Sequence, residues 1–330
     1  MKRIELITAA LLAVLLAVLD AAPAGAQETF PSRVVNIINP NAPGGTSDII
    51  GHGMTDALRQ AFKQPVVMTS RVGAGGAVGG AYVAQAPADG YTVLLNTVTH
   101  VLIPITDNLF GRSAGYAVQD FVLPARITAD PLLFVVHQSI PARTVSEFIA
   151  YARSKPGEVI YSSTGLYGSA HIAMAMLTRA ADVKLIHSPF NGAGPAMTAV
   201  LGNHANAFFA PAGVASPHVQ SGRVRLLAQS GPTRVILFAD TPTLKEAGYD
   251  VDLMLWAGFF LPAKTPPAVV RTWQAALRES AQDQRFRDAM TKINVTVDYL
   301  DGDALKLWYD EELKRLEREI RAIGRIEGRN

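Results

Sequence analysis

Three glycine-rich loops hold the residues whose types and spacing suit the binding of an anion. They read APGGTSD (42–48), SSTGLYGSAH (162–171) and FNGAGPA (190–196), and each separates an apolar run from an amphipathic stretch. A loop of this kind that enters a helix leaves backbone N–H groups unpaired, and these can donate hydrogen bonds to a negative charge. A single loop of this kind is more often an ordinary strand-to-helix turn, in which glycine supplies a positive φ and a hydroxyl caps the helix, but three such loops together favour an anion site.

One such loop is too weak to bind a solute by itself. A charge near an exposed helix N-terminus gains about 0.3 to 1 kcal/mol, whereas micromolar affinity needs about 8 kcal/mol. Several loops must therefore converge and exclude water, which favours a cleft that closes between two lobes.

Few residue patterns for enzyme chemistry occur in the sequence. It contains no His-Glu-x-x-His or Gly-Lys-Ser/Thr motif. Ser169 and His171 lie two residues apart, too close along a helix to face one another. The loop GAGGAVGG (73–80) has Val78 where a dinucleotide-binding loop needs its third glycine. No catalytic residue, metal ligand or cofactor is predicted; an exported hydrolase or oxidoreductase that uses the same cleft is the alternative.

The elements that must position these loops alternate between strands and helices. Short apolar runs at 34–38, 65–68 and 92–95 read as strands, and the 3 and 4 spacing of apolar residues from Ile50 to Phe62 predicts a helix. A second set of units begins near residue 130, with strands expected at 132–137, 159–163, 183–188, 205–210 and 224–229. This alternation predicts an α/β protein with mainly parallel sheets and helices on both faces.

The chain is expected to form two lobes. We predict that residues 27–129 form the first part of lobe 1, that 130–253 form lobe 2, and that 254–330 return to lobe 1. The run WAGFFLPA (256–263) reads as the returning strand, and helical stretches follow it.

The N-terminal segment has the layout of a secretory signal peptide. Lys2 and Arg3 precede an uncharged apolar stretch, and small residues end at Ala26, where cleavage is expected. Residues 1–26 are thus predicted to be removed and the mature protein to be periplasmic. The chain has no cysteine and a net charge of +2, which favours neither disulfides nor a nucleic-acid partner. We expect a monomer.

The sequence resembles the extracytoplasmic solute receptors of tripartite tricarboxylate transporters, the Bug receptors. The likeness covers essentially all of the mature chain. It rests on FPSRVVNIINPNAPGGTSDII, QPVVMTSRVGAGGAVGG, APADGYTVLL, YSSTGLYGSAHIA, HSPFNGAGPAMTAVLGN and DTPTLKEAGYDVDLMLWAGFFLPAKTPPAVV.

This resemblance implies a two-lobed periplasmic-binding-protein fold of the Venus flytrap type II. It implies a receptor that captures a small organic mono- or dicarboxylate and delivers it to integral-membrane transporter subunits; signalling to a sensor kinase is a further alternative. The ligand-binding residues that the resemblance implies are Pro43, Gly44, Gly45, Thr46, Ser47, Asp48, Ser163, Thr164, Gly165, Ser169, Ala170, His171, Asn191 and Gly192.

Some residues depart from the family's usual pattern. His52 follows Gly51 where the family usually has Ala-Arg, and Asn206 stands where an acid is usual. Loss of acids near the cleft would ease the binding of a more highly charged anion, or the changes are neutral. Asp48 lies beside the expected anion, so we expect it to accept N–H bonds at the first helical turn rather than to contact an amine on the ligand.

Overall fold

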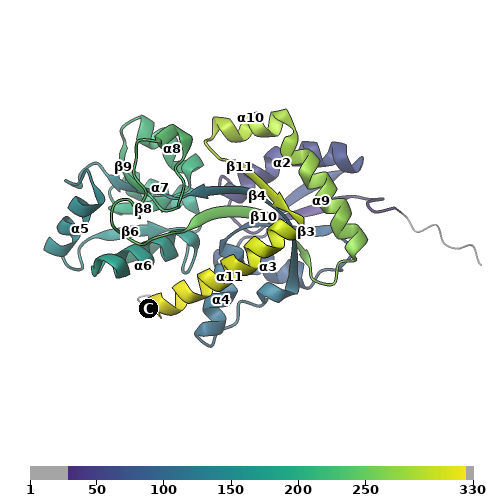
Figure 1. The fold of residues 1–330 in the computed structure, drawn as a ribbon, viewed down its shortest axis with the longest axis horizontal. Coiled ribbons are helices and arrows are strands. Elements are labelled where there is room, and N and C mark those ends of the chain that lie inside the picture. The colour runs from purple at the N-terminus through teal and green to yellow at the C-terminus, as the bar shows by residue number, and fades with distance from the viewer. Residues whose placement is uncertain (1–28, 325–330) are drawn as a thin grey trace, which may run out of the picture.

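The computed structural model describes residues 29–324, and it contains two β-sheets, each at the centre of a lobe (Figure 1). The predicted signal peptide, residues 1–26, lies outside the described residues. The first sheet has the strand order β11 (Val297–Asp301), β4 (Phe121–Pro131), β10 (Met254–Pro262), β3 (Thr92–Thr97), β1 (Val35–Asn39) and β2 (Val66–Ser70). The second has the order β7 (Ile186–Pro189), β6 (Ile160–Ser163), β8 (Ala207–Ala210), β5 (Leu133–His137) and β9 (Val224–Gln229).

The two sheets share one plan. In each, three parallel strands come first, ordered β2-β1-β3 and β7-β6-β8, and antiparallel strands complete the sheet. The α/β class and the two lobes are as predicted, but the expectation of mainly parallel sheets is wrong. Strands β10, β4 and β11 run antiparallel to their neighbours in the first sheet, as does β5 in the second, because the chain crosses between the lobes through β4, β5 and β10.

The crossing consists of two neighbouring strands. The chain leaves the first sheet at Pro131, enters the second at Leu133 and returns at Met254, which pairs with Pro131. From these bounds we propose that the lobes divide at residues 130 and 254.

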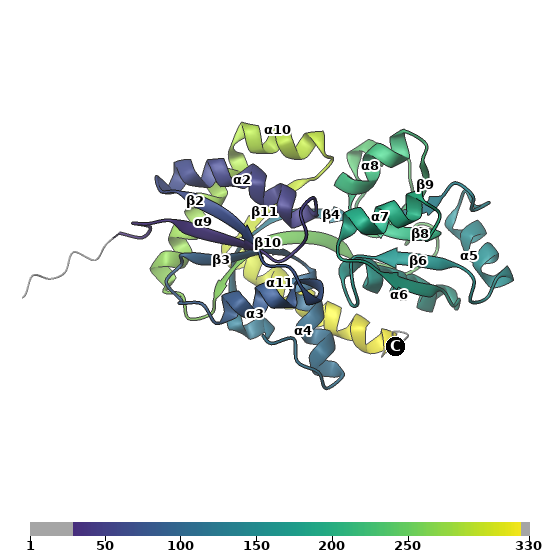
Figure 2. The ribbon, with the colours of Figure 1, turned by 180° about the vertical axis from the view of Figure 1, so that it is seen from behind.

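Helices cover both faces of the first sheet. Ile37 faces a core that includes α2 (Thr46–Phe62), α9 (Pro267–Gln282) and α10 (Gln284–Lys292). The next residue, Ile38, faces the opposite core, with α3 (Ala77–Ala84), α4 (Thr99–Leu109) and α11 (Gly302–Ile323). Figure 2 shows these two layers from behind, with α2 and α10 on one side of the strands and α3 and α4 on the other. The alternation follows from the two-residue period of a strand.

The second lobe contains α5 (Val145–Ser154), α6 (Ser169–Ala181), α7 (Ala193–Leu201) and α8 (Ala212–Gln220). Helix α11 contacts both lobes. The Nε1 atom of Trp256, in β10 of the first sheet, donates to Glu312 of α11, and Arg179 of α6 forms an ion pair of 3.0 Å with Glu319 of α11. Within residues 29–324, no helix has the length and apolar character needed to cross a membrane.

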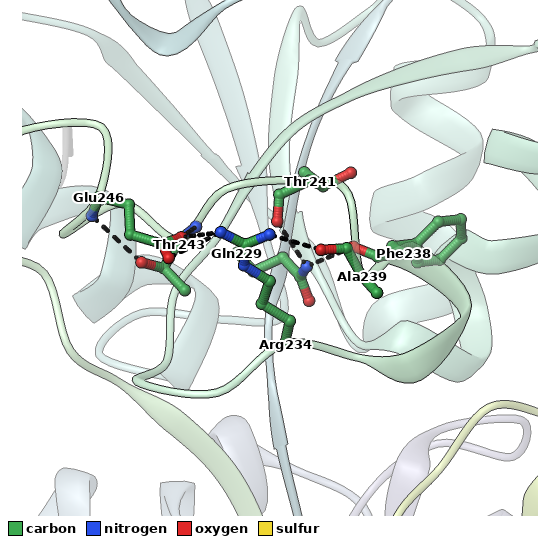
Figure 3. Close-up of polar contacts among 7 residues, drawn as sticks. All are labelled: Gln229, Arg234, Phe238, Ala239, Thr241, Thr243 and Glu246. Atoms are coloured by element: carbon green, nitrogen blue, oxygen red, sulfur yellow. Dashed lines mark hydrogen bonds and ion pairs between the residues drawn. The ribbon is translucent and has the colours of Figure 1, made fainter.

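The segment between β9 and β10 is held by side-chain contacts (Figure 3). The Nε2 atom of Gln229 donates to the carbonyl oxygens of Phe238 and Thr241, at 3.0 and 3.1 Å. Arg234 donates to both carboxylate oxygens of Glu246 at 2.7 Å. These contacts fix a segment with little regular structure, which leads the chain back to the crossing strand.

Candidate functional site

Three helices that follow the predicted loops begin at glycines without a side-chain cap. The residues before α2, α6 and α7 are Gly45, Gly168 and Gly192, and no side chain accepts a hydrogen bond from the first turn of these helices. Thr144 caps α5 and Asp283 caps α10, whereas α3, α4, α8, α9 and α11 also lack a side-chain cap. The starts of α2, α6 and α7 therefore keep the partial positive charge of their N–H groups available to an anion.

Loops from the two lobes meet at two places. A Cβ atom built on Gly192 would lie 3.6 Å from the Cβ of Ala42, so the α7 loop contacts the α2 loop. A Cβ atom built on Gly165 would lie 3.8 Å from the Cα of Gly75, so the α6 loop contacts the loop before α3. The structure thus brings the three predicted loops together across the lobes.

Asp48 stabilises the loop that precedes α2 through hydrogen bonds. Its side chain is buried, and it accepts hydrogen bonds from the backbone N–H of Gly44 at 2.9 Å and from Nδ2 of Asn39 at 3.1 Å. His52 approaches the same carboxylate at 3.6 Å. Asp48 therefore accepts an N–H bond, as expected from the sequence.

The other residues of the first loop differ in exposure. Pro43 and Gly44 are exposed, and Gly45 and Thr46 are half-buried. Thr46 lines a small pocket between the lobes, beside the start of α8. Ser47 is buried, and its hydroxyl donates to Asn39 at 2.8 Å, so this side chain stabilises the loop.

In the second lobe, Ser163 and His171 hold the loop between β6 and α6. The Oγ atom of Ser163 lies 2.6 Å from Nε2 of His187 and accepts the N–H of Gly165 at 3.2 Å. Nδ1 of His171 accepts the N–H of Tyr167 at 2.8 Å, and its ring stacks on that of His187 with centroids 3.9 Å apart. The imidazoles of His171 and His187 thus hold the loop between β6 and α6 in place.

The Ser163–His187 pair has the spacing of a nucleophile and its base. Ser163, however, is fully buried, and burial lowers the pKa of His187 to about 4, which makes it a weak base. Burial, with the neighbouring His187, also lowers the pKa of His171 to about 3. This arrangement suits two neutral, packed histidines better than a catalytic pair. Among residues 29–324, no group of three histidine or acidic side chains could hold a metal ion.

The remaining predicted residues lie around the same loops. Thr164 is half-buried and Asn191 is exposed, at the rims of the second and third loops. Ser169 and Ala170 are buried in the first turn of α6, where Ser169 forms no hydrogen bond with another described side chain. The site therefore presents mainly backbone and small side chains.

One wall of the site comes from a loop that was not predicted to take part in it. The loop Gly73–Gly76, set aside as an imperfect dinucleotide loop, forms the short 3₁₀ helix η1 (Ala74–Gly76) and contacts Gly165 of the second lobe. Asn96, at the end of β3, lies next to this loop. The signal in the sequence was the run of glycines directly after a strand, the same design as in the three loops that were chosen.

Comparisons with known proteins give the family. Residues 50–325 match the tripartite tricarboxylate transporter family receptor. The protein BugT of Bordetella pertussis is 28% identical, over 92% of this chain and 93% of that protein.

Among solved structures, the periplasmic binding protein BugD has a TM-score of 0.81 at 24% identity; the match covers 91% of this chain and 100% of that chain. MatC of Rhodopseudomonas palustris, solved with bound malate, has a TM-score of 0.80 at 24% identity, over 88% of this chain and 100% of that chain. At this identity the two structures show the fold, which is that of the periplasmic binding proteins. The chain belongs to the receptor family of the tripartite tricarboxylate transporters, whose members are extracytoplasmic solute receptors that work with membrane transporters.

Proposed function

We propose that this chain binds a small organic mono- or dicarboxylate between its lobes and delivers it to the integral-membrane subunits of a tripartite tricarboxylate-type transporter. The observation that carries the proposal is the meeting of glycine-started, uncapped helices from both lobes. The three loops contain no lysine or arginine, so the backbone and hydroxyls would hold the anion. The bound malate in MatC supports a carboxylate ligand.

The two-strand crossing supports a binding step followed by closure. In the open form, the α2 loop binds one end of the ligand; rotation about β4 and β10 then adds the donors of α6 and α7 and excludes water. The closed form would dock on the membrane subunits. We further propose that the protein acts in the periplasm after cleavage behind Ala26, without catalysis and without a cofactor.

A thermal-shift screen of residues 27–330 tests the ligand class. The panel contains malate, adipate and aromatic mono- and dicarboxylates, with the matching amides as controls. A ligand at 100 times its dissociation constant should stabilise the fold by about 2.7 kcal/mol. A shift with a carboxylate and none with its amide supports the proposal, whereas a shift only with an uncharged solute, a nucleotide or a metal overturns it. Recovery of the carboxylate chemically unchanged separates a receptor from an enzyme.

Two hydroxyl deletions test the position of the site. Thr46→Ala and Ser169→Ala should each weaken binding of the carboxylate found in the screen by about 0.5 to 1.5 kcal/mol, because each removes one hydrogen bond, or by more where the bond reaches the charged group. Titration calorimetry measures the change. Unchanged affinity in both variants would place the ligand elsewhere.

A further inference from the structure

Strand β2 is a free edge of the first sheet. It pairs with β1 on one side, and within residues 29–324 no strand pairs with its other side. Arg71, directly after β2, donates its backbone N–H to a carbonyl of β1, so the odd-numbered residues direct their backbone groups towards β1 and the even-numbered residues direct them outward. Arg59 occupies one outward group, because its Nε atom donates to the carbonyl of Val66 at 3.0 Å. The N–H and C=O groups of Met68 and Ser70 remain available to an added strand.

Exposed apolar side chains gather beside this edge. Nine large apolar side chains are exposed within residues 29–324, and five of them fall between residues 34 and 82. We call these five and the free edge of β2 the β2 surface: Val34, Val67, Val72, Val78 and Tyr82. Val67 pairs with Asn36, so it shares with Val34 the face of the sheet on which α3 packs. Apolar side chains gathered in this way indicate a site of interaction with another molecule.

Two contacts hold the segment after β2 against α3. A Cβ atom built on Gly73 would lie 2.7 Å from Cγ2 of Val78. The guanidinium carbon of Arg71 lies 3.7 Å from the centroid of the Tyr82 ring. Because Val78 and Tyr82 are one turn apart on α3, the exposed side of this helix and the edge of β2 form one surface.

The charges beside the β2 surface are positive. Lys63 precedes β2 and Arg71 follows it; both are exposed, and within residues 29–324 neither forms an ion pair. No aspartate or glutamate occurs from residue 57 to residue 88. An acidic segment would therefore be attracted to this surface. A second copy of this chain would be repelled, because antiparallel pairing of two β2 strands brings Lys63 of one copy towards Arg71 of the other.

We propose that the β2 surface binds an extended acidic and apolar segment of a partner protein, which adds a strand to β2. The backbone of the segment pairs with Met68 and Ser70, its apolar side chains lie on the face of Val67, and its acidic residues lie near Lys63 and Arg71. Main-chain hydrogen bonds give such a complex its affinity, and alternate side chains give it specificity. The inference goes beyond the proposed function, because neither the carboxylate nor the contacts between the lobes take part in it.

Two synthetic peptides test the inference on the unchanged protein. Each has about nine residues, enough to reach from Lys63 to Arg71 in an extended strand, with three valines at alternate positions and threonine or serine between them. One peptide has glutamate at both ends and the other has lysine. Fluorescence anisotropy with residues 27–330 should show at least about tenfold tighter binding of the glutamate peptide, and this preference should shrink as salt is added.

Amide hydrogen exchange, followed by NMR, locates the bound peptide. The glutamate peptide should slow the exchange of the N–H groups of Met68 and Ser70, because both become hydrogen-bonded. Equal affinity of the two peptides, or unchanged exchange at both residues, would overturn the inference. Binding of the protein to phosphatidylglycerol vesicles without binding of the glutamate peptide would also overturn it, and would identify a lipid surface as the partner.

Variants of the β2 surface test the residues themselves. The double variant Lys63→Glu and Arg71→Glu should reverse the preference and bind the lysine peptide more tightly. Lys184→Glu, an exposed position of the second lobe, is the control and should keep the preference of the unchanged protein. Ser70→Pro removes an outward N–H and no bond to β1, so it should weaken the glutamate peptide by about two- to tenfold. A folded double variant that still prefers the glutamate peptide overturns the inference, and the two peptides on the unchanged protein decide if it fails to fold.

Discussion

Asp48 shows how a negative side chain can be accommodated beside the proposed anion site. Its carboxylate is buried and accepts hydrogen bonds from Gly44 and Asn39, so its charge is compensated within the loop. A carboxylate in the first turn also interacts favourably with the helix dipole. Its role is therefore to shape the α2 loop, whose N–H groups remain available to the proposed ligand.

Asp48→Asn tests this role. The amide can accept one of the two bonds but not both, so one of the two N–H donors faces an NH₂ group instead, and the free energy of unfolding should fall by about 1 to 3 kcal/mol. Urea denaturation measures the loss. Asp56→Asn, on an exposed turn of the same helix, should change stability by less than about 0.5 kcal/mol. Equal effects of the two variants would contradict the role assigned to Asp48.

Two buried histidines, His100 and His171, and the half-buried His187 should make the fold sensitive to acid. Burial lowers the pKa of His100 to about 3, of His171 to about 3 and of His187 to about 4, against about 6.5 in an unfolded chain. The unfolded state therefore binds protons first as the pH falls. Each histidine contributes stability that is complete above pH 6.5 and is lost towards pH 4, at about 1.4 kcal/mol per pH unit.

Asp130 opposes this trend. Burial raises its pKa to about 6, so its contribution is complete below pH 3.8 and is lost as the pH rises through 6. Three histidines outweigh one carboxyl group, and stability should fall from pH 6.5 to pH 4.

His100 lies in a cage formed by the rings of Tyr116, Phe121 and Phe260. The variant His100→Phe should reduce the slope of unfolding free energy against pH by about 1.4 kcal/mol per pH unit. Urea denaturation at several pH values measures it, and an unchanged slope would show that His100 does not titrate as described.

Contacts between residues close in the chain were easier to foresee than contacts set by strand pairing. Asp48 and Gly44 are four residues apart, and the sequence indicated that Asp48 would accept an N–H bond. The pairs Ser163–His187 and Asn41–Asn96 join neighbouring strands or their ends, so they depend on strand order and register, which the sequence does not show.

At the scale of elements, the start of α7 depends on glycine at one position only. Gly192 has φ of 114° and ψ of 172°, a region almost restricted to glycine, whereas Gly194 is helical and a Cβ there would meet nothing within 4 Å. The two glycines are two residues apart, so they provide a matched comparison.

Gly192→Ala should lower the free energy of unfolding by about 1 to 3 kcal/mol, because alanine is strained at this backbone conformation. Gly194→Ala should raise it by about 0.5 to 1 kcal/mol, because alanine favours the helix. Thermal or urea denaturation distinguishes them. A stabilised Gly192→Ala variant would contradict the conformation described for this loop.

The sequence predicted the parallel strand-helix units well, because hydrophobic periodicity and glycine-rich turns mark them locally. It did not predict the antiparallel neighbours of these units, nor strand β11 at residues 297–301. Strand direction within a sheet is decided by tertiary pairing, and the alternating pattern of β11 is short and interrupted by charged residues.

At the scale of the whole molecule, the lobes are joined by β4 and β10 and by the contact of α11 with α6. The predicted loops form the other contacts between the lobes. Gly192 lies against Ala42, and Gly165 lies against Gly75. In the proposed function an anion enters this site only if these loops separate, so ligand uptake requires the lobes to open.

A reversible cross-link measures this most directly. The chain has no cysteine, and the 3.6 Å separation of the Cβ positions at residues 42 and 192 suits a disulfide. In the double variant Ala42→Cys and Gly192→Cys, the oxidised protein should fail to bind the carboxylate identified by the screen, and reduction of the same sample should restore binding in calorimetry. Equal binding by the oxidised and reduced forms would contradict the account, because the ligand would then reach its site without passing between the lobes.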